Sequence, residues 1–114
     1  MSDPWPTELV LDRAKTTLTV RFDNGEEFVL KAEYLRVESP SAEVQGHSPN
    51  QKQTVRGKQN VKIAGLEPVG NYAVRILFDD GHDTGLYSWD YLRELGREHA
   101  ARWAAYAKAR GSHG

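Results

Sequence analysis

Two short motifs each occur twice in this sequence, in the same order and at nearly the same spacing. Phe-Asp-x-Gly occurs at Phe22–Gly25 and Phe78–Gly81, and Tyr-Leu-Arg follows at Tyr34–Arg36 and Tyr91–Arg93. An Asp-x-Gly run between apolar stretches is typical of a tight β-hairpin turn, because Asn, Asp and Gly tolerate positive φ. The repetition therefore predicts two similar units, each a hairpin followed by a helix that carries Tyr-Leu-Arg.

The residues around the turns alternate between apolar and polar, which is the period-two pattern of half-buried strands. In Asn71–Phe78 we expect the apolar face of Tyr72, Val74, Ile76 and Phe78 to meet the core. The predicted fold class is α+β: one small domain with an antiparallel β-sheet built from the two hairpin-plus-helix units and a long C-terminal helix. The predicted strands and the first helix are Glu8–Asp12, Thr17–Phe22, Glu27–Leu30, Ala32–Val37 (helix), Val61–Pro68 and Asn71–Phe78.

The C-terminal helix is predicted to begin after Ser88, a good N-cap residue, and to dock on the sheet through one apolar stripe. Gly96 lies inside this helix, where it costs about 1 kcal/mol relative to alanine and favours a kink. We expect the tryptophans to lie in the core rather than to form a ligand platform. The stripe is Leu92, Leu95, His99, Trp103 and Tyr106, and the tryptophans are Trp5, Trp89 and Trp103.

The size and charge of the chain limit the number of domains and the kinds of partner that it can have. Its 114 residues predict one domain, 1–114, with a polar basic loop at 47–60 and a frayed tail at 111–114. The net charge of −1 makes nucleic acid an unlikely partner, and no apolar run is long enough for a membrane span. The N-terminus lacks the features of a signal peptide, so we expect a cytoplasmic protein. Cysteine is absent, which excludes thiolate chemistry within the chain.

The loop at 47–60 carries Lys52, Arg56 and Lys58 and no acidic residue. Such a loop is most often simply solvated. Its functional interpretation is a basic docking surface for an acidic partner, because clustered charge speeds encounter.

His82 is the one turn residue that could do chemistry. It lies among Asp79, Asp80 and Asp83, and an imidazole with carboxylates can bind a divalent metal. The spacing does not form a complete local ligand set, so a turn histidine hydrogen-bonded to its surroundings is the simpler interpretation. An enzymatic site around Asp80 and His82 is the least favoured of the alternatives.

The motifs together resemble the gamma-butyrobetaine hydroxylase-like N-terminal domain, from about Pro6 to Leu95. The resemblance is carried by Tyr34–Arg36, Ser39–Ala42, Pro68–Val74 and Asp80–Leu92. It implies a small domain that, in the hydroxylases, precedes a separate iron- and 2-oxoglutarate-dependent oxygenase domain. That oxygenase domain is not in this sequence, so its activity is not carried over.

In those hydroxylases the domain holds a structural zinc through Cys-Pro-Cys-x-x-Cys and one histidine. Here the resemblance places Ser39, Ser41 and Val44 at the cysteine positions and His82 at the histidine position. One neutral imidazole cannot hold structural zinc, so the resemblance implies a vestigial site, no bound metal and no cofactor. We expect a hydrogen bond to His82 to brace the two segments in place of the metal.

The resemblance also implies that related domains are fused to Mrp-type P-loop proteins that carry iron–sulfur clusters. The sequence therefore predicts a non-catalytic accessory or protein-interaction module, linked to iron–sulfur or metal handling, with a protein partner of unknown identity. The candidate interaction residues are His82, Asp80, Asp83, Lys52, Arg56 and Lys58. The alternative is a metal-binding protein that uses His82 and the neighbouring carboxylates.

Overall fold

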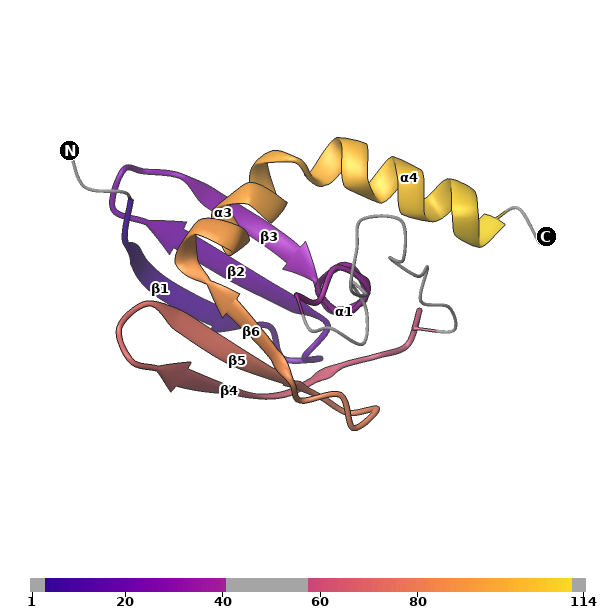
Figure 1. The fold of residues 1–114 in the computed structure, drawn as a ribbon, viewed down its shortest axis with the longest axis horizontal. Helices are drawn as coiled ribbons and strands as arrows, with labels where there is room; N and C mark the ends of the chain where they lie inside the picture. The colour runs from indigo at the N-terminus through magenta and orange to yellow at the C-terminus, as the bar shows by residue number, and fades with distance from the viewer. Residues whose placement is uncertain (1–3, 41–57, 112–114) are drawn as a thin grey trace.

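The strands divide into two antiparallel sheets of three strands, each followed by a helix. The computed structural model describes residues 4–40 and 58–111. The α+β fold and its two hairpin-plus-helix units are confirmed, although the strands form two sheets rather than one continuous sheet (Figure 1). The first unit contains β1 (Pro6–Leu11), β2 (Thr17–Phe22), β3 (Glu27–Lys31) and α1 (Ala32–Val37), and the second contains β4 (Ile63–Val69), β5 (Ala73–Phe78), β6 (Gly85–Ser88) and α3 (Trp89–Arg97), followed by α4 (His99–Gly111).

The hairpin turns of the two units have matching hydrogen bonds. The amide of Phe22 donates to the carbonyl of Glu26 at 2.9 Å, and the amide of Phe78 donates to that of His82 at 3.0 Å. Gly25 and Gly81 both adopt a φ of 91°, which favours glycine at this point of the turn. The repeated Phe-Asp-x-Gly motif is therefore a repeated structure.

The two Tyr-Leu-Arg helices bind each other reciprocally. The Tyr34 hydroxyl donates to the Leu95 carbonyl at 2.7 Å, and the Tyr91 hydroxyl donates to the Glu38 carbonyl at 2.5 Å. Each acceptor lies four residues after the tyrosine of its own helix. Such an exchange of equivalent contacts is what an approximate two-fold relation between the halves produces.

The motif arginines repeat this exchange. Arg36 in α1 forms an ion pair with Asp80 in the β5–β6 turn at 2.9 Å, and Arg93 in α3 pairs with Glu26 after the β2–β3 turn at 2.6 Å. Each helix is thus fastened to the hairpin turn of the other half.

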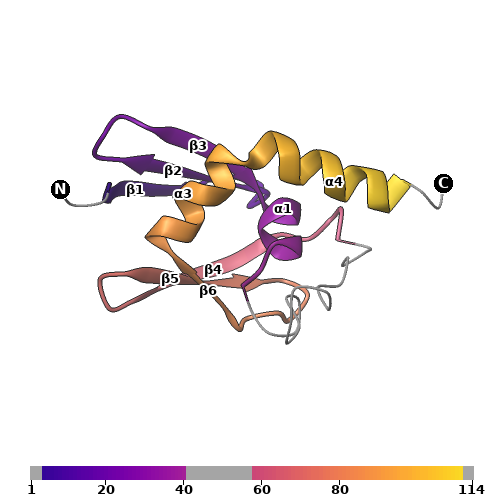
Figure 2. The ribbon, with the colours of Figure 1, turned by 45° about the horizontal axis from the view of Figure 1, so that its top comes forward.

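The core lies between the sheets, where α1 and α3 fill the space that separates them (Figure 2). Both sheets and both helices contribute fully buried side chains, among them Leu18, Tyr34, Ile76 and Leu92. On β5 the predicted core face is correct for Val74, Ile76 and Phe78. It is wrong for Tyr72, which is 56% exposed because it lies in the turn before the strand begins.

The predicted C-terminal helix is two helices, since α3 ends at Arg97 and α4 begins at His99. The sequence predicted a kink near this point. Gly96 lies against the ring of Phe28. The glycine therefore leaves room for this ring, in addition to weakening the helix where it bends. Among the described residues, no helix is long and apolar enough to cross a lipid bilayer.

The apolar stripe docks on the sheet as predicted only in α3, and its part in α4 packs against Tyr34 of α1. Leu92, Leu95 and Tyr106 are buried, whereas His99 and Trp103 are only partly buried. The Tyr34 ring contacts His99 edge-to-face at 4.7 Å between centroids, so α4 packs on the helix of the first unit.

Candidate functional site

Ser39 and His82 meet in the interior, although 43 positions separate them along the chain. His82 Nε2 lies 2.9 Å from Ser39 Oγ, and both residues are buried. Ser39 follows α1 directly, and His82 follows the β5–β6 turn. The structure thus brings together two of the four positions that the family resemblance implied, with a hydrogen bond between them. The other two, Ser41 and Val44, lie outside the described residues.

Glycine at position 85 makes this contact compatible with the fold. A side-chain Cβ at Gly85 would lie 2.7 Å from Ser39 Oγ and 2.9 Å from Cε1 of Tyr87. Tyr87 is itself fully buried and donates its hydroxyl proton to the Leu35 carbonyl. Burial raises the pKa of the Tyr87 hydroxyl, so it stays protonated as a donor. The Ser39–His82 pair therefore belongs to a closely packed structural cluster.

The carboxylate of Asp80 is occupied by cations of the chain itself. Arg36 Nε lies 2.9 Å and Lys58 Nζ 2.6 Å from Asp80 Oδ2, and the His82 amide donates to Oδ1 at 3.0 Å. Burial alone would raise the pKa of Asp80, but the hydrogen bonds from Lys58, the His82 amide and Arg36 outweigh it and lower the pKa to about 2. A divalent metal at Asp80 would have to displace these partners.

Of the remaining predicted interaction residues, the structure describes only Asp83 and Lys58. Asp83 is exposed at the end of the turn. Lys58 is bound to Asp80 rather than presented alone to a partner. Lys52 and Arg56, with most of the predicted loop at 47–60, lie outside the described residues, as does most of the predicted tail at 111–114.

Replacing His82 by alanine is expected to lower the free energy of unfolding by about 1 kcal/mol, the net value of one hydrogen bond. Zinc affinity should be negligible in both proteins, because the serine hydroxyl is a poor substitute for a thiolate. Urea unfolding and zinc calorimetry measure the two quantities.

Two controls accompany this measurement. Asp83→Ala, a change at the exposed residue next to His82, should alter stability by less than about 0.5 kcal/mol. EDTA should leave the thermal midpoint of the wild type unchanged. Unchanged stability of His82→Ala together with loss of a micromolar zinc site would instead favour the metal-binding alternative.

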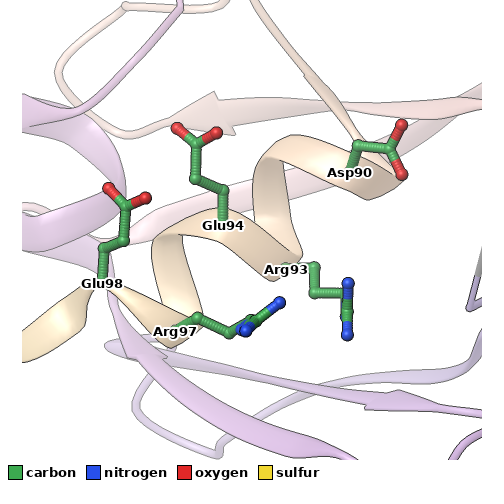
Figure 3. Close-up of a pocket in the computed structure, with 5 residues that line it drawn as sticks. All are labelled: Asp90, Arg93, Glu94, Arg97 and Glu98. Carbon is green, nitrogen blue, oxygen red and sulfur yellow. The ribbon is translucent and has the colours of Figure 1, made fainter.

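A groove of about 510 Å³ follows the outer side of α3 (Figure 3). Figure 3 shows Arg93 and Arg97 extending to one side of the helix and Glu94 and Glu98 to another. Several of these charges already have partners, since Arg93 pairs with Glu26 and Arg102 pairs with Glu94 at 2.6 Å. The mixed charge gives this groove no preference for a ligand of one sign. It is lined by Asp90, Arg93, Glu94, Arg97 and Glu98.

A second cleft, of about 470 Å³, is aromatic, and the sequence reasoning missed it. Trp5 is 49% exposed, so the prediction that it lies in the core is wrong, and Trp89 is only partly buried. The available signals were the prolines on both sides of Trp5, which keep it off the strand pattern, and the position of Tyr72 beside a turn glycine. The cleft is lined by Pro4, Trp5, Asn71, Tyr72, Ser88, Trp89 and Asp90.

Hydrogen bonds hold the backbone of Trp5 and the indole of Trp89 in place. The Trp5 amide donates to Asp23 Oδ1 at 3.1 Å, and the Asp23 amide donates back to the Trp5 carbonyl at 2.8 Å. The Trp89 indole donates to the Asn71 carbonyl at 2.9 Å, and its amide donates to the Tyr72 carbonyl at 3.1 Å. The two indoles meet edge-to-face, with centroids 6.5 Å apart.

Gly70 lies against the third ring of the cleft, that of Tyr72. Its φ is 54°, and a Cβ at this position would lie 3.0 Å from Cε1 of Tyr72. The Tyr72 ring therefore lies over a glycine that leaves space for it. The three rings come from the residue before β1, the β4–β5 turn and the start of α3.

Comparison with known proteins identifies the family. The model of the gamma-butyrobetaine hydroxylase-like N-terminal family matches residues 9–93. The chain belongs to this family. The match includes the Ser39–His82 contact, whereas Trp5 and α4 lie outside the matched range. None of the curated proteins compared matches the chain.

Solved structures share the fold over most of the chain. A protein determined by NMR in solution is 48% identical, with a TM-score of 0.80 over 95% of this chain and 80% of its own. A second NMR structure is 46% identical, with a TM-score of 0.79 over 95% of this chain and 85% of its own. A crystal structure of a protein of unknown function from Acidithiobacillus ferrooxidans is 38% identical, with a TM-score of 0.70 over 83% of this chain and 98% of its own.

Proposed function

We propose that this domain is a non-catalytic protein-interaction module that docks a partner in the aromatic cleft of Trp5, Tyr72 and Trp89. The observation that carries the proposal is the exposure of the Trp5 and Tyr72 rings beside the partly buried Trp89 around one cleft. Its volume of about 470 Å³ falls in the range of binding pockets, about 300–1,000 Å³. Trp and Tyr are the residues most enriched among those that dominate binding energy at protein interfaces.

The environment of the candidate chemical groups supports a role without catalysis. Ser39 and His82 bind each other in the interior, and Asp80 is held by Arg36 and Lys58. A catalytic base or nucleophile must instead reach a substrate. Each of these polar groups has a structural purpose here.

The link to iron–sulfur or metal handling rests on the family resemblance alone. Within residues 4–40 and 58–111, no three metal-ligating side chains gather into a group. We therefore propose that any such role is exerted through contact with a partner that carries the metal. The cytoplasmic location predicted from the sequence stays a prediction.

Affinity capture from cells that produce the protein tests the docking proposal when the variants are compared side by side. Tyr72→Ala should abolish a specific interaction made by the wild type, because the ring contributes little to the core. Val29→Ala is the matched control, since Val29 is 57% exposed on β3 and does not line the cleft. The proposal fails if Tyr72→Ala retains every partner of the wild type.

A further inference from the structure

The aromatic cleft carries one charged group, Asp90. Asp90 lies in the first turn of α3 and is exposed at the rim of the cleft. Within the described part of the chain it takes part in no ion pair and no side-chain hydrogen bond. The other acidic residue of α3, Glu94, is paired with Arg102 at 2.6 Å. Asp90 is thus a carboxylate without a cation, beside three aromatic rings.

The lining of the cleft is complementary to a cation. It contains aromatic, neutral polar and proline residues with one acid, and no Lys, Arg or His. A cation within about 6 Å of an aromatic ring centre is attracted by the ring's quadrupole, and Trp and Tyr are strong partners. A carboxylate beside the rings adds a charged acceptor.

Among biological cations, the arginine side chain fits these features most completely. Its planar guanidinium can stack on an aromatic face and still present a fork of N–H donors to a carboxylate. It is also more weakly hydrated than the ammonium of lysine, so it enters an aromatic cleft at a lower desolvation cost.

We propose that the cleft of Trp5, Tyr72, Trp89 and Asp90 binds an arginine side chain on an extended segment of a partner protein. The proposal rests on the docking function proposed above and names the chemistry of the partner. The guanidinium stacks on the exposed rings and pairs with Asp90. The Trp89 indole is held by its hydrogen bond to the Asn71 carbonyl, so this ring loses little side-chain freedom on binding.

Single exposed aromatic residues are normal on protein surfaces and need no explanation. This cleft differs because its rings come from three separate parts of the fold, where hydrogen bonds hold the Trp5 backbone and the Trp89 indole. Their convergence on an unpaired carboxylate is what a binding site for an organic cation requires.

An NMR titration with a defined peptide tests the proposal. The probe is an N-acetylated, C-amidated pentapeptide with a central arginine between two prolines, because prolines keep the segment extended at little entropic cost. We expect saturable shifts of the Trp5 and Trp89 indole N–H signals and of the Asn71 and Tyr72 amides, with a Kd of about 1 mM or tighter. The Trp103 indole does not line the cleft and serves as the internal reference.

Matched variants identify the cation contact. Asp90→Asn should raise the Kd of the arginine peptide about tenfold, the usual effect of losing one charge-assisted contact. Asp83→Asn should leave binding unchanged, because Asp83 is an exposed carboxylate at the opposite end of the β5–β6 hairpin. Tyr72→Leu, which keeps apolar bulk without a ring, should also weaken binding. Amide spectra away from the cleft verify that each variant is folded.

The proposal is overturned if the arginine peptide gives no saturable shift at the cleft. It is equally overturned if a peptide with glutamine in place of arginine binds as tightly, or if Asp90→Asn binds like the wild type. None of these results decides the docking function, which is tested separately by partner capture with Tyr72→Ala. Capture that depends on Tyr72 without arginine recognition would retain the interaction module and reject this partner chemistry.

Discussion

Replacing Gly96 by alanine is expected to destabilise the protein by about 2 kcal/mol, although alanine is the better helix former. In an exposed helix interior the same change would stabilise by about 1 kcal/mol. Here a Cβ at position 96 would overlap the ring of Phe28, including its Cγ atom, which cannot move without moving the whole side chain. Such overpacking costs about 1–3 kcal/mol or more, so it outweighs the gain in helix propensity.

A double-mutant cycle with Phe28→Ala separates the two effects. Without the ring, Gly96→Ala should become neutral or stabilising, which gives a coupling energy of about 2–3 kcal/mol between the positions. Urea denaturation of the four proteins provides the measurement. If Gly96→Ala stabilises the wild-type background, the ring and the helix do not meet as described.

The approximate two-fold relation gives this contact a counterpart in the other half. The register pairs Val20 with Phe28 in the first sheet and Ile76 with Gly85 in the second, so Phe28 and Gly85 occupy equivalent positions. Counted from the tyrosines of the helices, Gly96 is equivalent to Ser39. In one half, Phe28 on the strand lies against Gly96. In the other half, Gly85 on the strand lies against Ser39.

This exchange explains why only one half contains the Ser39–His82 pair. In the first half the ring of Phe28 fills the space between strand and helix. In the second half Gly85 leaves that space open, and the hydroxyl of Ser39 enters it to reach His82. The family resemblance places the zinc ligands in the second half, where Gly85 leaves this space.

The repeated hairpins and the Tyr-Leu-Arg helices could be predicted because their signals are local. Turn residues such as Gly25 and Gly81 have a fixed backbone requirement, and the alternation on β2 and β5 is visible in the sequence. The same local reasoning interpreted Gly96 only as a weak point in a helix. Its contact with Phe28 depends on how two distant elements pack, which propensity does not encode.

The candidate sites show the same limit. Ser39 and His82 could be associated before the structure only through the family resemblance, because no local pattern links positions so far apart. The aromatic cleft had no such guide. Tryptophan is usually a core residue, so the sequence suggested burial for Trp5 and Trp89. Only the fold shows that the two residues meet in a surface cleft.

Replacing Gly85 by alanine is expected to destabilise the protein by about 1–3 kcal/mol, again by overpacking. The added Cβ would lie 2.7 Å from Ser39 Oγ and 2.9 Å from Cε1 of Tyr87. Neither neighbour can move easily, because Tyr87 is fully buried and bonded to the Leu35 carbonyl, and Ser39 is bonded to His82. Urea unfolding measures the loss, and the ring signals of His82 in NMR report whether its contact with Ser39 changes.

Gly65→Ala is the matched control for this effect. Gly65 also lies in a strand of the second sheet, but a Cβ there would meet only Cδ1 of Leu77, at the ordinary distance of 3.9 Å. That change should be neutral or stabilising by up to about 1 kcal/mol, since glycine is the more flexible residue in the unfolded chain. Ser39→Ala should remove part of the cost of Gly85→Ala, because it deletes the nearer of the two atoms. If Gly85→Ala is as well tolerated as Gly65→Ala, the serine and the strand are not in contact, and the brace at His82 needs another explanation.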